Sequence, residues 1–67
     1  MEVKEAYQDF DITIERNGGE NKYLICRESD GLVIYDTCEM TSDVPKTMMR
    51  HMRGKVDDYY KNPEDYE

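Results

Sequence analysis

Apolar and polar positions alternate along the chain with the period of a half-buried strand between residues 10 and 15. Phe10, Ile12 and Ile14 fall on one side of this segment, and acidic or hydroxyl side chains fall on the other. Residues 17–19 read Asn-Gly-Gly and tolerate the positive φ of a hairpin turn, and residues 22–28 are rich in strand-forming side chains. The pattern therefore predicts a β-hairpin.

A second turn at residues 29–31, Ser-Asp-Gly, leads into a predicted third strand over residues 32–40. If both turns are three residues long, Glu28 lies opposite Leu32 and the apolar side chains of all three strands share one face. That face is predicted to contain Phe10, Ile12, Ile14, Leu24, Cys26, Leu32, Ile34 and Cys38. The register sets Cys38 opposite Lys22, about 13 Å along the strand from the position opposite Cys26, so we expect two free thiols.

The period changes to that of a helix from residue 44 to residue 61. The apolar stripe comprises Val44, Met48, Met52, Val56 and either Tyr59 or Tyr60. Residues 41–43 are candidate caps, Pro45 suits a first helical turn, and Gly54 falls on the solvent side. We predict an α+β domain over residues 1–62, a three-stranded antiparallel β-meander covered on one face by the helix (βββα). Residues 63–67 are expected to form a flexible acidic tail with nothing to bury.

Charge changes this picture from a generic small domain to an acidic one. The 67 residues contain 16 acidic and nine basic side chains, a formal net charge of −7. Residues 46–55 carry four of the bases, Lys46, Arg50, Arg53 and Lys55, and no acid. Such a surface repels nucleic acid and attracts basic protein, although a charge of about 2 to 8 in magnitude is also ordinary for solubility. The basic cluster is interpreted as a solvated flank, paired with Asp57 or with an acid of a second subunit.

No combination of side chains indicates catalysis or metal binding. A catalytic site needs a nucleophile, a base and an orienting group, and the chain has one histidine, His51. The spacings between Cys26, Cys38 and His51 match no compact zinc pattern. We expect a protein that is not an enzyme and has no cofactor or metal.

No apolar run approaches the ~20 residues that span a bilayer, and no apolar signal segment follows the first residues. We therefore expect a soluble, cytoplasmic protein without a membrane partner. A domain of this size buries only about 60% of the surface of its unfolded chain, so self-association would help to stabilise it.

The predicted register leaves apolar side chains on the sheet face opposite the helix. These are Tyr23, Ile25, Val33 and Tyr35. One helix cannot cover both faces of a sheet, and an exposed apolar patch usually marks an interaction site. The face is interpreted as a homodimer or partner interface, with scattered surface aromatics as the alternative.

Two groups of acids are candidate partner-binding residues. Asp9, Asp11 and Glu15 are predicted on the outer face of an edge strand, where Asp9 and Asp11 lie about 7 Å apart, a spacing similar to that of neighbouring phosphates. Asp57 and Asp58 lie near the helix C-terminus, where they oppose the helix dipole. The alternative for the first group is that charges on an edge strand discourage aggregation.

In size, charge and rows of carboxylates, the chain resembles, as a class, the small acidic inhibitor proteins of bacteriophages, some of which imitate DNA. The resemblance implies a decoy that binds a basic DNA-binding protein of a host cell, such as a histone-like nucleoid protein, without binding nucleic acid itself. Carboxylates would replace phosphates at the partner's Lys and Arg side chains. The alternative function is a homodimeric protein-binding adaptor or regulator that uses the Tyr23 and Tyr35 face.

Overall fold

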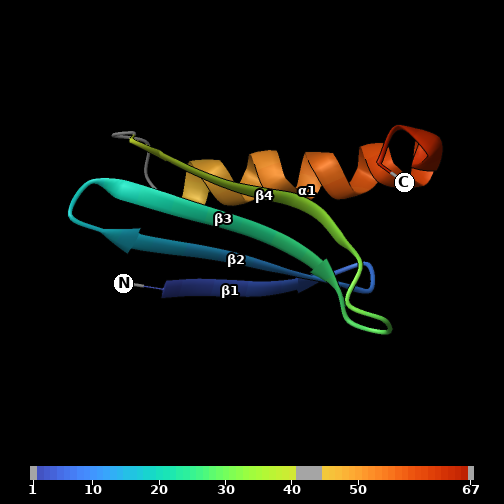
Figure 1. The fold of residues 1–67 in the computed structure, drawn as a ribbon, viewed down its shortest axis with the longest axis horizontal. Coiled ribbons are helices and arrows are strands. Elements are labelled where there is room, and N and C mark those ends of the chain that lie inside the picture. The colour runs from blue at the N-terminus through green and yellow to red at the C-terminus, as the bar shows by residue number, and fades with distance from the viewer. Residues whose placement is uncertain (1, 41–44, 67) are drawn as a thin grey trace.

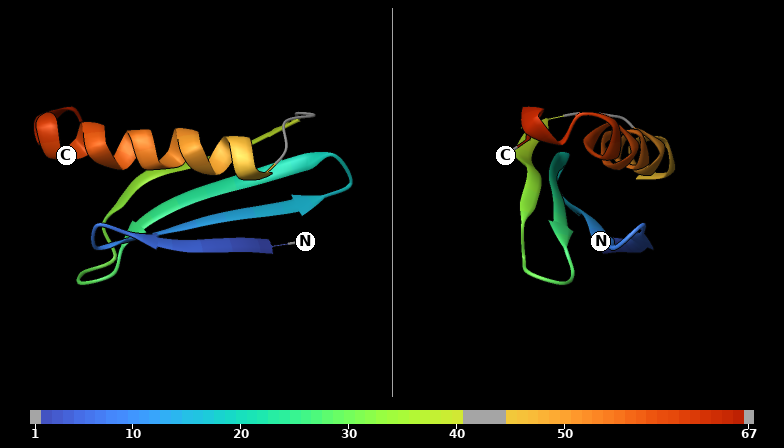
Figure 2. Two further views of the ribbon diagram at one scale, coloured as in Figure 1. Left: turned by 180° about the vertical axis from the view of Figure 1, so that it is seen from behind. Right: turned by 90° about the vertical axis from the view of Figure 1, so that its right-hand side faces the viewer.

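The computed structural model describes residues 2–40 and 45–66 and shows an α+β fold, an antiparallel sheet with one helix packed across one of its faces (Figure 1). The strands are β1 (Glu2–Tyr7), β2 (Phe10–Asn17), β3 (Glu20–Arg27) and β4 (Val33–Met40), and they lie side by side in chain order. The helix α1 (Pro45–Lys61) follows, and then a short 3₁₀ helix, η1 (Pro63–Asp65). Figure 2 shows that the helix lies on one side of the sheet and leaves the other side open.

The sheet has four strands, so the prediction of three is wrong. The additional strand, β1, directs Val3 and Tyr7 toward the core, where both are partly buried, with Glu5 between them. β1 joins β2 through a two-residue turn in which Gln8 and Asp9 both have positive φ, 47° and 70°. Turns of this kind favour Gly, Asn and Asp, and Gln8-Asp9 carries only part of this signal because it contains no glycine.

The first predicted turn is one residue shorter than expected. Gly18 and Gly19 have φ values of 59° and 88°, and Asn17 pairs directly with Glu20. Both values are typical of a two-residue hairpin turn. A shift of one residue in register moves every side chain of the following strand to the other face, so the predicted faces of β3 are exchanged.

Consequently part of the predicted core is wrong. Leu24 is 37% exposed and Cys38 is exposed, and both lie on the sheet face away from the helix. Tyr23 and Ile25, predicted to lie on that outer face, are 1% and 0% exposed and pack beneath the helix. Cys26, also predicted in the core, is only partly buried.

The predicted register of β3 with β4 is confirmed over most of its length. Lys22 pairs with Cys38 as expected, and the same offset continues to Ile25 and Tyr35. A bulge between Ile25 and Cys26 then breaks the alternation. The bulge brings Ile34 into the core at 8% exposure while Tyr35 remains on the helix side.

The hydrophobic core lies between α1 and the inner face of the sheet. The predicted helical stripe is confirmed at every described position. The buried core residues are Phe10, Ile12, Ile14, Tyr23, Ile25, Ile34, Met48, Met49, Met52, Val56 and Tyr59. Gly54 is exposed, as predicted. Val44 and the candidate caps at residues 41–43 lie outside the described residues.

The expectation that nothing beyond residue 62 is buried is wrong for Tyr66. This side chain is partly buried against the core, and its ring meets that of Tyr59 edge-on with a centroid distance of 5.9 Å. Its hydroxyl donates a hydrogen bond to the Asp58 carboxylate at 2.6 Å. The packed domain therefore extends to Tyr66.

Candidate functional site

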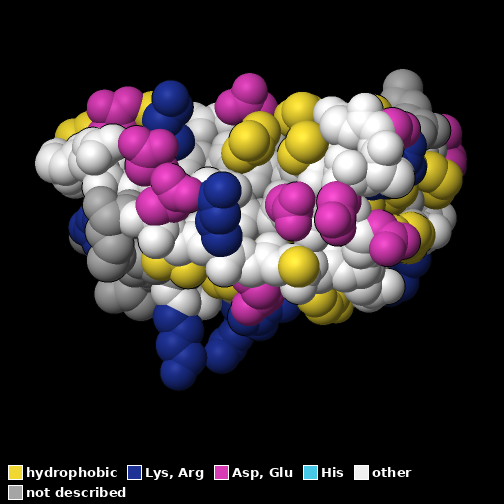
Figure 3. All heavy atoms as spheres, turned by 90° about the horizontal axis from the view of Figure 1, so that it is seen from below, with side chains coloured by type: hydrophobic (Ala, Val, Ile, Leu, Met, Phe, Trp, Pro, Cys, Tyr) yellow, Lys and Arg dark blue, Asp and Glu magenta, His cyan; other side chains and the backbone are white. Residues whose placement is uncertain are grey.

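The candidate site is the sheet face that the helix leaves uncovered, here called the open face. It consists of the outward-pointing residues of β1 to β4, and Figure 3 views the molecule from this side, with acidic side chains spread across it. Its charged members are Glu2, Lys4, Asp11, Glu15, Glu20, Lys22 and Asp36. Five carboxylates against two ammonium groups give this face a negative charge.

Strand pairing arranges these side chains in rows that cross the sheet. One row runs from Lys4 on β1 through Thr13 and Leu24 to Asp36 on β4. The next row runs from Glu2 on β1 through Glu15 and Lys22 to Cys38 on β4. Between the rows lies a hollow of about 270 Å³, lined by Thr13, Glu15, Lys22, Tyr23, Leu24 and Asp36.

Only part of the predicted acidic set lies on the open face. Asp11 and Glu15 do, and the Glu15 Oε1 atom accepts a hydrogen bond from the Asn17 side-chain amide at 2.8 Å. Asp9 lies in the turn between β1 and β2 and not on a strand. The prediction that this strand forms an edge is also wrong, because β2 lies between β1 and β3.

Asp57 and Asp58 are used for contacts within the molecule. The Asp57 carboxylate accepts hydrogen bonds from the Tyr7 hydroxyl at 2.9 Å and from the Gln8 side chain at 3.1 Å, which ties the helix to the end of β1. Asp58 accepts the bond from Tyr66, and this bond raises the pKa of the tyrosine to about 12. The fold does not bring these two acids onto the open face with Asp11.

The predicted aromatic face is not formed. Tyr23 and Ile25 are buried under the helix, and Tyr35 lies on the same side, with the Lys55 ammonium 4.3 Å from its ring centroid. Of the four predicted residues, only Val33 points to the open face, where it is 45% exposed. A homodimer stays a prediction, but Tyr23 and Ile25 cannot supply its interface in this structure.

The basic cluster of the helix is partly neutralised by β1. The Arg53 guanidinium forms two bonds to Glu5, at 2.5 and 3.2 Å, and these lower the pKa of the Glu5 carboxyl. The sequence suggested Asp57 as the internal partner of this cluster, but the partner of Arg53 in the structure is Glu5. Lys46 and Arg50 are exposed residues of α1, which lies on the side of the sheet opposite the open face (Figure 2).

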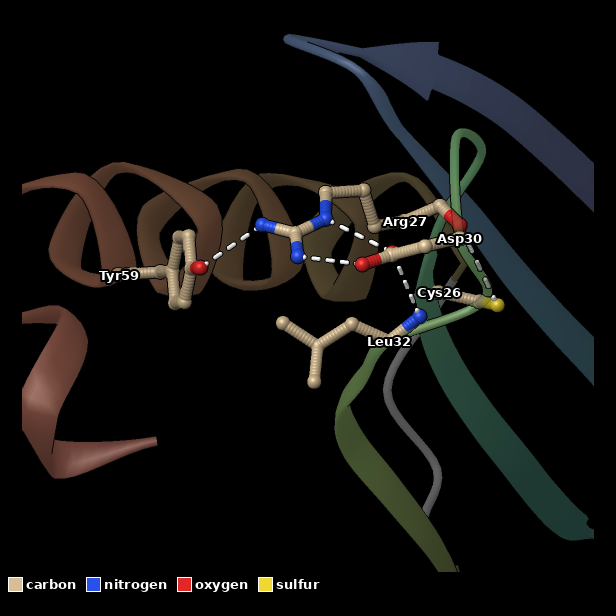
Figure 4. Close-up of polar contacts among 5 residues, drawn as sticks. All are labelled: Cys26, Arg27, Asp30, Leu32 and Tyr59. Carbon is tan, nitrogen blue, oxygen red and sulfur yellow. Dashed lines mark hydrogen bonds and ion pairs between the residues drawn. The ribbon is translucent and has the colours of Figure 1, made fainter. Parts of the chain in front are cut away.

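A polar network holds the turn between β3 and β4 against the helix (Figure 4). Arg27 donates two bonds to the Asp30 carboxylate, at 2.9 and 2.7 Å, and a third to the Tyr59 hydroxyl at 2.9 Å. Asp30 also accepts a bond from the Leu32 backbone N–H at 3.1 Å. Chiefly because of the Arg27 bond, the pKa of Asp30 falls to about 2. The network holds the start of β4 against the C-terminal part of α1.

The two cysteines are free thiols. The Cys38 thiol donates a hydrogen bond to the carboxylate of Glu20 on the neighbouring strand. This bond raises the pKa of the thiol, which reduces the fraction present as the reactive thiolate. Cys38 is therefore a poor candidate for a nucleophile.

Sequence reasoning missed Glu20, Leu24 and Asp36 as members of the open face. A two-residue reading of the Gly18-Gly19 turn would have found Leu24, because the pairing of Asn17 with Glu20 fixes which β3 side chains point outward.

Within residues 2–40 and 45–66, no three His, Cys, Asp or Glu side chains gather where they could hold a metal ion. In the same part of the chain, no helix has the length and apolar character needed to cross a bilayer. Comparisons with protein-family models, with curated proteins and with solved structures return no match to this chain.

Proposed function

We propose that this protein binds a basic nucleic-acid-binding protein through the open face and thereby competes with nucleic acid for that partner. One observation carries the proposal: the helix covers only one side of the sheet, and the uncovered side carries five carboxylates and two lysines. An uncovered and negatively charged surface suits a partner that presents Lys and Arg side chains to the phosphates of DNA.

The spacing of the carboxylates supports this mechanism. Neighbouring strands lie about 4.8 Å apart and residues rise about 3.3 Å along each strand, so Asp11 and Glu15 are separated by roughly 13 Å on β2. Glu20 and Asp36 extend the array onto β3 and β4. Several basic side chains of one partner can therefore bind at once, and the release of their counterions adds affinity that falls with salt, as it does for DNA.

The proposal is tested by displacement of a fluorescent DNA duplex from a histone-like nucleoid protein. The test variant combines Asp11→Asn, Glu15→Gln and Asp36→Asn, three changes that keep side-chain size and remove three charges from the open face. Inhibition should fall, and its dependence on salt should become shallower. Circular dichroism checks that the variant is folded.

A matched control removes the same charge elsewhere. Glu28→Gln, Glu64→Gln and Asp65→Asn change exposed acids in the loop after β3 and in η1. If the two triple variants lose inhibition equally, net charge and not the open face is responsible. Unchanged inhibition by the folded test variant would exclude the open face as the competing surface.

A second candidate function is a salt-tolerant protein contact through the apolar side chains of the same face. Leu24, Val33 and Met40 are 37%, 45% and 74% exposed and lie on the outward side of β3 and β4. An adaptor of this kind would keep its binding at high salt and lose it in Leu24→Ser or Val33→Ser. A decoy for a nucleic-acid-binding protein would lose its binding at high salt and keep it in Leu24→Ser and Val33→Ser.

A further inference from the structure

We propose that the hollow on the open face is a subsite for one arginine side chain of a partner protein. The inference rests on the proposed function for its biological setting, but its chemistry is independent of DNA. It adds a specific position on the face where one type of basic residue is preferred.

The size and lining of the hollow suit a long side chain. Its volume of about 270 Å³ is several times the roughly 30 Å³ share of one liquid water and lies below the usual range of small-molecule pockets, about 300–1,000 Å³. The Leu24 side chain supplies an apolar surface, and Tyr23 contributes its backbone, because its ring points to the helix side. The methylene groups of an incoming Arg can pack on Leu24 while its charged end stays polar.

Carboxylates flank this apolar surface from two different strands. Glu15 comes from β2 and Asp36 from β4, two strand spacings across the sheet and two residues along it, or roughly 12 Å apart at the backbone. The bond from Asn17 holds Glu15 in place. A planar guanidinium carries donors along both edges and can bind two carboxylates at once, whereas an ammonium group acts as a point charge. The arrangement therefore favours arginine over lysine and excludes anions.

Lys22 is the internal competitor for the same space. It lies between the two acids on β3, directly opposite Glu15, and lines the hollow. Its ammonium group forms no ion pair within the described ranges 2–40 and 45–66. Lys22 can therefore swing outward when a guanidinium enters. Its charge lowers the affinity of the native hollow, so removing that charge should improve binding.

The experiment is an NMR titration of the full chain with two blocked tripeptides, Gly-Arg-Gly and Gly-Lys-Gly. We expect the arginine peptide to bind more tightly and to shift the amide signals around Thr13, Leu24 and Asp36. Asp36→Asn should weaken arginine binding about threefold, as expected for a solvent-screened ion pair. Lys22→Gln should strengthen it by a similar factor, an effect that mere damage to the fold cannot produce.

Asp11→Asn is the matched control, because Asp11 lies on the same face and carries the same charge but does not line the hollow. Equal binding of the two peptides, or equal losses in Asp11→Asn and Asp36→Asn, would overturn the subsite and leave only diffuse acidity. If DNA displacement persists while no arginine binding is found, the subsite is wrong and the proposed function stands. Arginine binding at the hollow without DNA displacement supports the subsite and counts against the decoy function.

Discussion

The orientation of β3 can be tested by truncating two adjacent side chains, Ile25 and Leu24. Ile25 is fully buried beneath the helix at 0% exposure, and Leu24 points to the open face at 37% exposure. A one-residue shift in the register of the first hairpin would exchange these environments. Ile25→Ala and Leu24→Ala therefore report directly on which face of the sheet the helix covers.

The expected magnitudes differ severalfold. Ile25→Ala leaves a cavity in the core and should cost about 2–5 kcal/mol of unfolding free energy. Leu24→Ala removes a partly solvated side chain without forming a cavity and should cost at most about 1 kcal/mol. A domain of this size has roughly 3–5 kcal/mol of stability in total, so Ile25→Ala can unfold it at 25 °C. The milder pair keeps both proteins folded: Ile25→Val should cost about 1 kcal/mol and Leu24→Val close to nothing.

Urea unfolding followed by far-UV circular dichroism measures both pairs. For a domain of 60–100 residues, about 1 kcal/mol corresponds to a shift in Tm of roughly 4–8 °C, so thermal melts provide a second readout. A larger loss in the Leu24 variants than in the Ile25 variants would refute the observed register. It would also remove the open face as described, because Lys22 and Leu24 would then point toward the helix.

Three further predictions concern pH, the helix and the thiols. Arg27 depresses the pKa of Asp30 from 3.8 to about 2. The ionised Asp30 carboxylate therefore stabilises the folded state fully above pH 4. This stabilisation is lost as pH falls toward 2, and urea unfolding should show a smaller acid-induced loss in Asp30→Asn. Gly54→Ala should stabilise the protein by about 1 kcal/mol in thermal melts, because the added Cβ meets no atom within 4 Å on the exposed side of α1. At pH 8, Cys38 should react with a thiol reagent more slowly in the unsubstituted protein than in the Glu20→Gln variant, because the hydrogen bond to Glu20 raises the pKa of the thiol.

Each of these has a control. Gly19→Ala should destabilise the protein, opposite in sign to Gly54→Ala, because Gly19 has a φ of 88° that L-residues rarely adopt. A Cys26→Ser background isolates the reactivity of Cys38. Equal reaction rates with and without Glu20→Gln would show that the hydrogen bond from Cys38 to Glu20 does not control the reactivity of the thiol. If Asp30→Asn lost as much stability in acid as the unsubstituted protein, other carboxylates would be responsible for the acid sensitivity.

Local periodicity in the sequence determined the helix and three of the strands. The stripe of Met48, Met52, Val56 and Tyr59 predicts the buried side of α1 because a helix repeats every 3.6 residues regardless of its surroundings. The offset between β3 and β4 was also predictable up to the bulge, since a short turn fixes the pairing of the strands that it joins. Asp11 and Glu15 were correctly predicted on the outer face of the sheet, because they alternate with the apolar residues of β2.

Tertiary structure decided the strand number, the parity of β3 and the membership of the open face. The apolar pattern of β1 is weak, because Glu5 occupies an inward position between Val3 and Tyr7. The fold accommodates this carboxylate through its bonds to Arg53 of the distant helix, a contact that the local sequence does not indicate. The faces of β3 depended on a difference of one residue in the length of a glycine turn, which composition alone does not fix. Leu24 and Asp36 became neighbours only through strand pairing, because a surface that crosses a sheet is assembled from residues far apart in the chain.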